Sequence, residues 1–122
     1  MIQFDNVTKT YLAGTVGLKS ISFGIEDNDF VFLVGPSGAG KTTILKLLMR
    51  QIKPTSGSVI IDGTEISSPA FHDVTTLRRS IGMVFQDFKI LQDRNVFENI
   101  AIALKIMDKP HHEIVDEVSE AL

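Results

Sequence analysis

The sequence predicts an α/β fold in which an apolar strand, a glycine-rich loop and a helix follow one another. The strand is the apolar run Phe30–Val34, which is rich in β-branched and aromatic residues. The loop Gly35–Thr42 reads GPSGAGKT and matches the pattern G-x-x-x-x-G-K-S/T. Thr43–Ile52 has apolar residues at helical spacing and continues the element that the loop begins. This succession is the context that the loop pattern requires, so we expect a phosphate-binding α/β core.

The residue types in the loop suit a phosphate group. Gly35, Gly38 and Gly40 lack a Cβ, so the backbone can adopt positive φ and turn its N–H groups around an anion. A helix that begins near Lys41 directs unpaired N–H groups and a partial positive charge to the same place. We expect the Lys41 ammonium on the β- and γ-phosphates and the Thr42 hydroxyl on Mg²⁺. ATP or GTP is therefore the expected ligand, and a glycine-rich turn that carries a lysine by chance is the alternative.

Further strands and turns are predicted on both sides of this core. Apolar alternation or a continuous apolar run predicts strands at Gln3–Asp5 with Val7–Leu12 as an edge strand, Ile21–Ile25, Ser58–Ile61 and Ile81–Phe85. Ala13–Thr15 is expected to be a turn, and Asp62–Gly63 is a hairpin signal. The helix after the loop should stop at Lys53–Pro54, because the residue before a proline disfavours the helical conformation.

The last part of the chain predicts helices. Asn95 followed by Glu98 is the pattern of a capping box, and a helix is expected behind it from Val96 to Met107. Its apolar face should consist of Val96, Ile100, Ala103, Leu104 and Met107. Pro110 interrupts the pattern, and Glu113–Leu122 begins a second helix with Ile114, Val115, Val118 and Leu122 on one side. The second helix should pack its apolar side on further sequence.

Composition excludes several classes of function. The 12 Lys and Arg against 15 Asp and Glu give a net charge of −3 without a basic cluster, so nucleic acid is not an expected partner. The chain has no cysteine, so it offers no disulfide and no thiolate metal site. No apolar stretch approaches the roughly 18 residues of a membrane span. His72, His111 and His112 lack the spacing of a metal site and are expected in solvated positions.

Three segments together resemble the ATP-binding subunits of ABC transporters, and within that family the cell-division type. They are Phe30–Thr42, Arg78–Leu91 and Asp93–Ala101. The resemblance covers the whole chain and aligns it with about the first half of such a subunit. It implies a P-loop nucleoside triphosphatase core of ABC type, with an antiparallel β edge and the start of the helical subdomain. The nucleotide-binding core would be 1–92, and 93–122 would begin the helical subdomain.

The resemblance also implies roles for residues outside the loop pattern. The aromatic residue that stacks on adenine falls on Tyr11, whose alternative interpretation is an aromatic side chain at a strand end. Thr43 would be a further phosphate contact, or else a residue that satisfies helix N–H groups. Gln86 would approach Mg²⁺ and the attacking water. Gly17 stands where alanine is usual in the family, and Asn28–Asp29 where a Gly-Glu pair is common, although asparagine also tolerates a left-handed conformation.

The complete expected site therefore has two catalytic residues, Lys41 and Gln86, and two metal-binding residues, Thr42 and Gln86. The nucleotide-binding residues would be Tyr11, Gly35, Pro36, Ser37, Gly38, Ala39, Gly40, Lys41, Thr42 and Thr43. The family's signature segment, catalytic glutamate and switch histidine align beyond Leu122. Asp62 does not replace the acidic residue, because Gly63 follows it in a turn. We expect a part of an ATP-binding domain that alone hydrolyses ATP at little above background.

For the whole subunit, the resemblance implies ATP hydrolysis that drives a membrane-bound division complex. It implies a homodimer that binds an integral membrane subunit at the cytoplasmic face of the bacterial inner membrane, with ATP and Mg²⁺ as cofactors. One alternative is an ATP-binding subunit of a solute or lipoprotein transporter. Another is a non-catalytic nucleotide-binding module. A P-loop kinase is disfavoured, because the residues between the loop helix and Gln86 follow the ABC pattern and offer no acceptor site.

Overall fold

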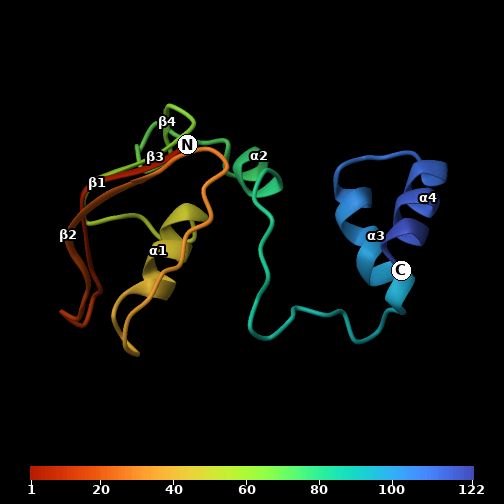
Figure 1. The fold of residues 1–122 in the computed structure, drawn as a ribbon, viewed down its shortest axis with the longest axis horizontal. Coiled ribbons are helices and arrows are strands. Elements are labelled where there is room, and N and C mark those ends of the chain that lie inside the picture. The colour runs from red at the N-terminus through yellow and green to blue at the C-terminus, as the bar shows by residue number, and fades with distance from the viewer. The chain divides into compact units, whose positions relative to one another are not determined.

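The computed structural model describes all 122 residues, which form two compact units, Met1–Ile81 and Gly82–Leu122. The first unit holds a sheet with two helices, and the second holds a pair of helices (Figure 1). These units are defined by packing. The expected functional division after residue 92 is a different boundary and stays a prediction. The α/β fold class is confirmed.

The sheet of the first unit has four strands in the order β2-β1-β3-β4, and every pair is antiparallel. The strands are β1 (Ile2–Thr10), β2 (Val16–Ile25), β3 (Ser56–Ile61) and β4 (Thr64–Glu65). The expectation that the first strand lies at an edge is wrong. Phe4 pairs with Phe23 of β2 on one side and with Val59 of β3 on the other, so β1 is an interior strand. Sequence alternation reports one buried face and does not report how many neighbours a strand has.

Local turn signals are confirmed. Asp62 and Gly63 join β3 to β4 with φ values of 47° and 76°, as the favoured two-residue hairpin turn requires. The turn between β1 and β2 is closed by a hydrogen bond from the Tyr11 N–H to the Thr15 carbonyl at 2.9 Å. Gly57 at the start of β3 has φ of 81° beside the shift in register between β1 and β3. A glycine at such a bulge avoids the strain of a side chain.

The core of the first unit lies between the sheet and two helices, α1 (Lys41–Leu48) and α2 (Val74–Arg79). Ile44 and Leu47 of α1 belong to one apolar cluster with residues of all the longer strands. The full set of buried residues in this cluster is Phe4, Val7, Leu18, Ile44, Leu47, Val59, Ile66 and Leu77. Helix α1 is shorter than expected, because the chain turns left-handed at Arg50 with φ of 52°. Helix α2 was not expected from the sequence, where the stretch reads as polar.

Two expected strands are not formed. Phe30–Val34 and Ile81–Phe85 form no regular secondary structure and pair with no strand. Phe30, Phe32 and Val34 are 85%, 77% and 85% exposed, so these apolar side chains face solvent. Parallel strands of this kind are stable when neighbouring strands pair with them and helices cover both faces. The present residues supply an antiparallel sheet that does not extend to either segment.

The second unit is a helical hairpin of α3 (Val96–Ile106) and α4 (His111–Ala121). The expected capping box is confirmed: the Asn95 side chain accepts from the Glu98 N–H at 2.8 Å, and the Glu98 side chain accepts from the Asn95 N–H at 3.1 Å. Ile114 and Val118 of α4 are buried against Ala101 of α3, with partly buried Phe97, Ile100 and Leu104 around them.

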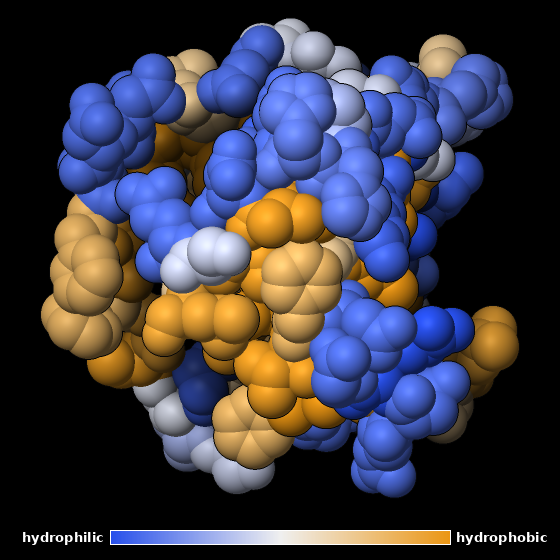
Figure 2. Space-filling model, turned by 90° about the vertical axis from the view of Figure 1, so that its right-hand side faces the viewer, coloured by the Kyte–Doolittle hydropathy of each residue, from blue (hydrophilic) through white to orange (hydrophobic).

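The expected apolar face of α3 needs correction. Val96, Ala103 and Met107 are exposed, and Phe97 with Ala101 takes the inner position. Val115 of α4 and Leu122 just after it are exposed, while Ile114 and Val118 are buried. The expectation that the apolar side of this helix packs on further sequence is wrong for Val118, because α3 buries it. A helix that is apolar on more than one side can turn either stripe inward, and the partner helix selects the stripe. In Figure 2, hydrophobic side chains reach the surface between hydrophilic ones. None of the helices has the length and apolar character needed to cross a bilayer.

Gly57→Ala should destabilise the first unit more than Gly63→Ala. Both glycines have left-handed backbones, with φ of 81° and 76°, which costs an alanine about 1–2 kcal/mol. A Cβ at Gly57 would also lie 2.3 Å from the Asn6 carbonyl oxygen, whereas a Cβ at Gly63 meets nothing within 4 Å. We expect this overlap to add about 1–3 kcal/mol to the loss in Gly57→Ala. Urea unfolding of both variants measures the difference, and equal losses would contradict the close approach.

Candidate functional site

The glycine-rich loop leads directly into helix α1 and is shaped by two left-handed residues. Gly38 has φ of 80°, and Gly40, the residue that precedes the helix, has φ of 93°. Residues 35–39 are exposed, whereas Gly40 is buried. A Cβ on Gly40 would lie 2.4 Å from the carbonyl oxygen of Gly17 in β2. The end of the loop therefore contacts the sheet backbone directly, and only glycine permits this approach.

Lys41 is the first residue of α1, and its side chain turns back across the loop. Its Nζ donates to the carbonyl oxygens of Gly35 at 2.6 Å and Pro36 at 2.7 Å. No side chain caps α1, and no acidic residue lies in its first turn. The ammonium and the uncapped N–H groups thus gather positive charge at the loop without a competing carboxylate from that turn.

The two threonines after Lys41 differ in their surroundings. Thr42 is exposed, so its hydroxyl is open to a ligand. Thr43 is only 7% exposed, and its Oγ1 lies 3.0 Å from the Tyr11 hydroxyl. Tyr11 follows strand β1, so this bond joins the sheet to the first turn of α1. The structure therefore brings Tyr11 together with the loop residues that the sequence predicted.

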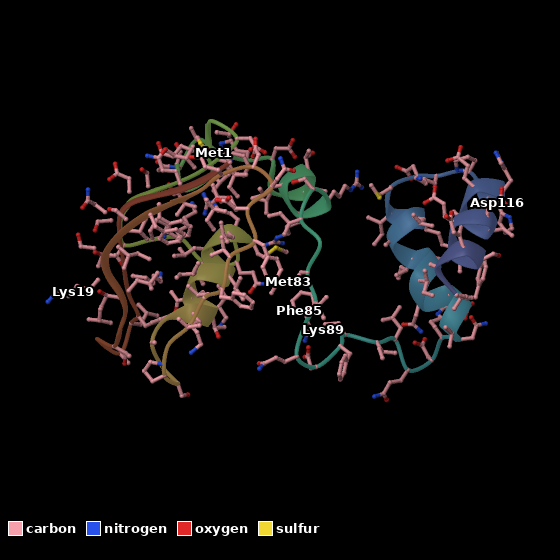
Figure 3. The ribbon with its side chains drawn as sticks, in the orientation of Figure 1. Met1, Lys19, Met83, Phe85, Lys89 and Asp116 are labelled. Atoms are coloured by element: carbon pink, nitrogen blue, oxygen red, sulfur yellow. The ribbon has the colours of Figure 1, made fainter.

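Gln86 belongs to the second unit and is described there. It is exposed and begins a turn of residues 86–89 that follows the unpaired segment Ile81–Phe85. Asp87 and Lys89 form an exposed ion pair in this turn, and the hydrogen bond from Lys89 lowers the pKa of Asp87. Figure 3 shows Phe85 and Lys89 beside each other, with the Lys89 Nζ 6.0 Å from the ring centre. The expected role of Gln86 stays a prediction.

Asp62 is a turn residue, as expected. It lies in the turn between β3 and β4 and accepts a hydrogen bond from the amine of Met1. Asp27 accepts a second hydrogen bond from the same amine. The two carboxylates raise the pKa of the amine to about 10, and Asp27 has the larger effect. The three histidines are exposed, and the structure has no cluster of three or more His, Asp or Glu residues arranged to hold an ion.

Sequence reasoning missed two arginines that connect the elements behind the loop. Arg50, which is buried, donates to the carbonyl oxygens of Ile66 and Ser68, the latter at 3.1 Å. Arg78 of α2 donates to the carbonyl oxygens of Met49 at 2.9 Å and Arg50 at 3.3 Å. These carbonyls follow the last turn of α1, so the pair fixes the end of the helix that begins at the loop. The sequence offered one signal for these bonds, the pair Arg78 and Arg79 that follows the apolar Leu77.

The residues around the loop fit a nucleoside triphosphate with Mg²⁺. The ammonium and the uncapped helix terminus suit an anion, and a Cβ at Gly38 would meet nothing within 4 Å, which leaves the loop open on that side. The exposed Thr42 hydroxyl is an oxygen donor of the kind that Mg²⁺ binds. This loop between β2 and α1, in an α/β unit, defines the chain as a P-loop domain.

The family follows from comparison with known proteins. The family model described as "ABC transporter" matches residues 18–122, and the chain belongs to this family. The expected resemblance to the cell-division type within this family is also confirmed. "Cell division ATP-binding protein FtsE" of Bacillus subtilis is 41% identical over 122 residues, which are 100% of the chain and 54% of that protein. The chain thus spans about half the length of this relative.

Two further comparisons agree with the family. "Methionine import ATP-binding protein MetN 2" of Bacillus cereus is 38% identical over 125 residues, which cover 100% of the chain and 37% of that protein. Among solved structures, a dimeric ATP-binding cassette in a post-hydrolysis state, bound to ADP and Pi, has a TM-score of 0.87 and 33% identity. The match covers 98% of the chain and 55% of the cassette. The expected fold of ABC type is therefore confirmed.

Arg78→Ala should destabilise the first unit, whereas Arg79→Ala should not. Both arginines are exposed, but the Arg78 guanidinium supplies two hydrogen bonds to carbonyls at the end of α1, while its neighbour Arg79 forms none. We expect a loss of about 1–3 kcal/mol in Arg78→Ala and a change within about 0.5 kcal/mol in the control. Urea unfolding at equal ionic strength compares them. A control that loses as much as Arg78→Ala would refute the specific role of these bonds.

Proposed function

We propose that the chain holds Mg-ATP at Gly35–Thr43 and is the nucleotide-binding part of an ABC-type ATPase. One observation carries this proposal: the Lys41 ammonium and the uncapped start of α1 meet at a loop whose end is held against the sheet by Gly40. Membership of the ABC transporter family supports the same nucleotide. The ammonium that now bonds the Gly35 and Pro36 carbonyls would transfer its hydrogen bonds to the phosphates.

The residues of this site would divide the work of binding. Lys41 would neutralise charge on the terminal phosphates, and Thr42 would bind the Mg²⁺ that neutralises the rest. The ring of Tyr11 would support the adenine, and Thr43 would contact a phosphate after it leaves the Tyr11 hydroxyl. Gln86 would orient the attacking water and bind Mg²⁺. These are the roles that the family resemblance implies for these residues.

Hydrolysis would depend on groups that these 122 residues do not supply. Asp62, the acidic residue that follows an apolar strand, is engaged with the Met1 amine in a hairpin turn. Charge neutralisation alone leaves the attacking water without a base. We propose that the complete protein hydrolyses ATP and that the 122 residues alone bind it with turnover near background. Paired cassettes, as in the dimeric relative bound to ADP and Pi, support a homodimer for the complete protein.

The biological context that we propose is bacterial cell division. Similarity to the cell-division ATP-binding protein extends over the whole chain. The protein would bind an FtsX-like integral membrane subunit at the cytoplasmic face of the inner membrane. The dimer would close when it binds nucleotide, and this conformational change would be transmitted to the membrane subunit. A second candidate is the ATP-binding subunit of a solute transporter, and the similarity to a methionine import protein favours it.

Mg-ATP should stabilise the chain in a manner that requires Lys41. A ligand at 100 times its dissociation constant stabilises the folded state by about 2.7 kcal/mol. We expect a shift of this size for the unaltered chain and for Lys46→Ala, an exposed lysine of the same helix. Lys41→Ala should remove most of the shift. Thermal or urea unfolding with and without millimolar Mg-ATP measures it, and an unaltered chain that does not respond would contradict the proposed site.

Co-purification should separate the two biological contexts. In one experiment the complete protein is co-expressed with an FtsX-like membrane subunit, and in the other with a methionine permease. The two membrane proteins carry the same affinity tag. We expect retention by the division subunit in the presence of Mg-ATP, and none by the permease. Retention by the permease alone would favour the transporter. Retention by neither would count against both partners while leaving the nucleotide site intact.

A further inference from the structure

The side chain of Tyr11 is held in place from several directions. Its hydroxyl lies 3.0 Å from Thr43 Oγ1. The Lys9 Nζ lies 5.6 Å from the ring centre, and the same ammonium donates to the Lys53 carbonyl at 2.7 Å. The edge of the ring lies against Gly17, because a Cβ built there would be 2.7 Å from Tyr11 Cε2. Contacts at the tip, the face and the edge thus fix one position of the ring.

Gly17 is the residue that makes this position possible. Its backbone does not have a left-handed conformation, so nothing local requires a glycine there. Its importance lies in the space that an alanine would fill: the added Cβ would overlap the Tyr11 ring and would lie 3.2 Å from Thr43 Oγ1. An alanine at this position and the Tyr11–Thr43 bond therefore exclude one another unless the ring moves.

The same bond controls access to Thr43. Thr43 is buried, and its hydroxyl, in the first turn of α1, already has Tyr11 as a partner. A phosphate that engages this hydroxyl must take it from the tyrosine. A base that stacks on the ring must likewise reach a face that Lys9 approaches. Two groups of the proposed nucleotide site are thus satisfied by each other before any ligand is engaged.

We propose that Tyr11 and Thr43 form a latch over the nucleotide site and that Gly17 is the positioning residue that lets it close. This inference rests on the proposed binding of Mg-ATP at the loop. Opening the latch costs the hydrogen bond between the two hydroxyls, so the latch lowers the affinity for nucleotide and couples occupation of the phosphate loop to release of the Tyr11 ring. Tyr11 then has two roles: when the latch is closed its hydroxyl occupies Thr43, and when the latch is open its ring stacks on the base.

Tyr11→Phe tests the latch directly, because it removes the hydroxyl and keeps the ring. A neutral hydrogen bond contributes on the order of 0.5–1.5 kcal/mol, so we expect Mg-ATP to bind about two- to tenfold more tightly to the variant. Isothermal titration of the 122-residue chain measures the dissociation constant. Weaker or equal binding by Tyr11→Phe would overturn the latch, since the bond would then support nucleotide binding or have no part in it.

Gly17→Ala provides a second test through the position of the ring, with Gly24→Ala as its control in the same strand. A Cβ at Gly24 would make only an ordinary contact, 3.9 Å from the Ile2 carbonyl oxygen. Tyr11 is the only tyrosine and the chain has no tryptophan, so tyrosine fluorescence reports this residue alone. Without nucleotide, acrylamide should quench Tyr11 more strongly in Gly17→Ala than in the unaltered chain or Gly24→Ala. Equal quenching would contradict the positioning role of Gly17.

Combining the two changes distinguishes one latch from two separate effects. Both single variants remove the same contact, so the double variant Tyr11→Phe with Gly17→Ala should bind Mg-ATP no more tightly than the tighter single one. Additive gains would contradict a shared mechanism. Lys41→Ala separates this inference from the proposed function. If the unaltered chain and Lys41→Ala bind equally poorly, the nucleotide site is wrong. If only Lys41→Ala loses binding and Tyr11→Phe gains none, the latch alone is wrong.

Discussion

The contact between the Gly40 backbone and the Gly17 carbonyl joins the phosphate loop to the sheet, and the geometry of the site depends on it. A Cβ on Gly40 would lie 2.4 Å from that oxygen, so the approach is closer than any side chain allows. Gly40 also precedes α1, and this contact therefore sets where the helix begins against β2. Gly17 also lies against the ring of Tyr11. The aromatic ring, the end of the phosphate loop and the first turn of α1 therefore all lie close to Gly17.

Features determined within a few residues could be predicted from the sequence. The capping box of α3 needs only Asn95 and Glu98, and the β3–β4 turn needs only Asp62 and Gly63. The phosphate loop belongs to the same class, because the positive φ of Gly38 and Gly40 is a local property. Membership of the ABC transporter family could likewise be predicted, since it rests on contiguous motifs.

Features that depend on distant neighbours could not be predicted from the sequence. Phe30–Val34 has the residues of a buried strand, yet a strand exists only where another pairs with it. The interior place of β1 and the inward stripe of α3 depend on partners in the same way. The bond between Tyr11 and Thr43 joins residues 32 positions apart, and the bonds of Arg78 span a similar separation. The spacing of apolar residues along the sequence does not indicate which distant residues form hydrogen bonds with one another.

The exposure of Phe30–Val34 has a consequence for how the protein must be made. The segment is uncharged, rich in β-branched and aromatic residues and free of proline, and its backbone is not paired. Short segments with these properties assemble into intermolecular β-structure when they remain uncovered. Folding is therefore a competition between covering this segment within one molecule and aggregation with others. Because the phosphate loop begins at Gly35, directly after this segment, the residues that govern solubility and the residues of the site are neighbours in the chain.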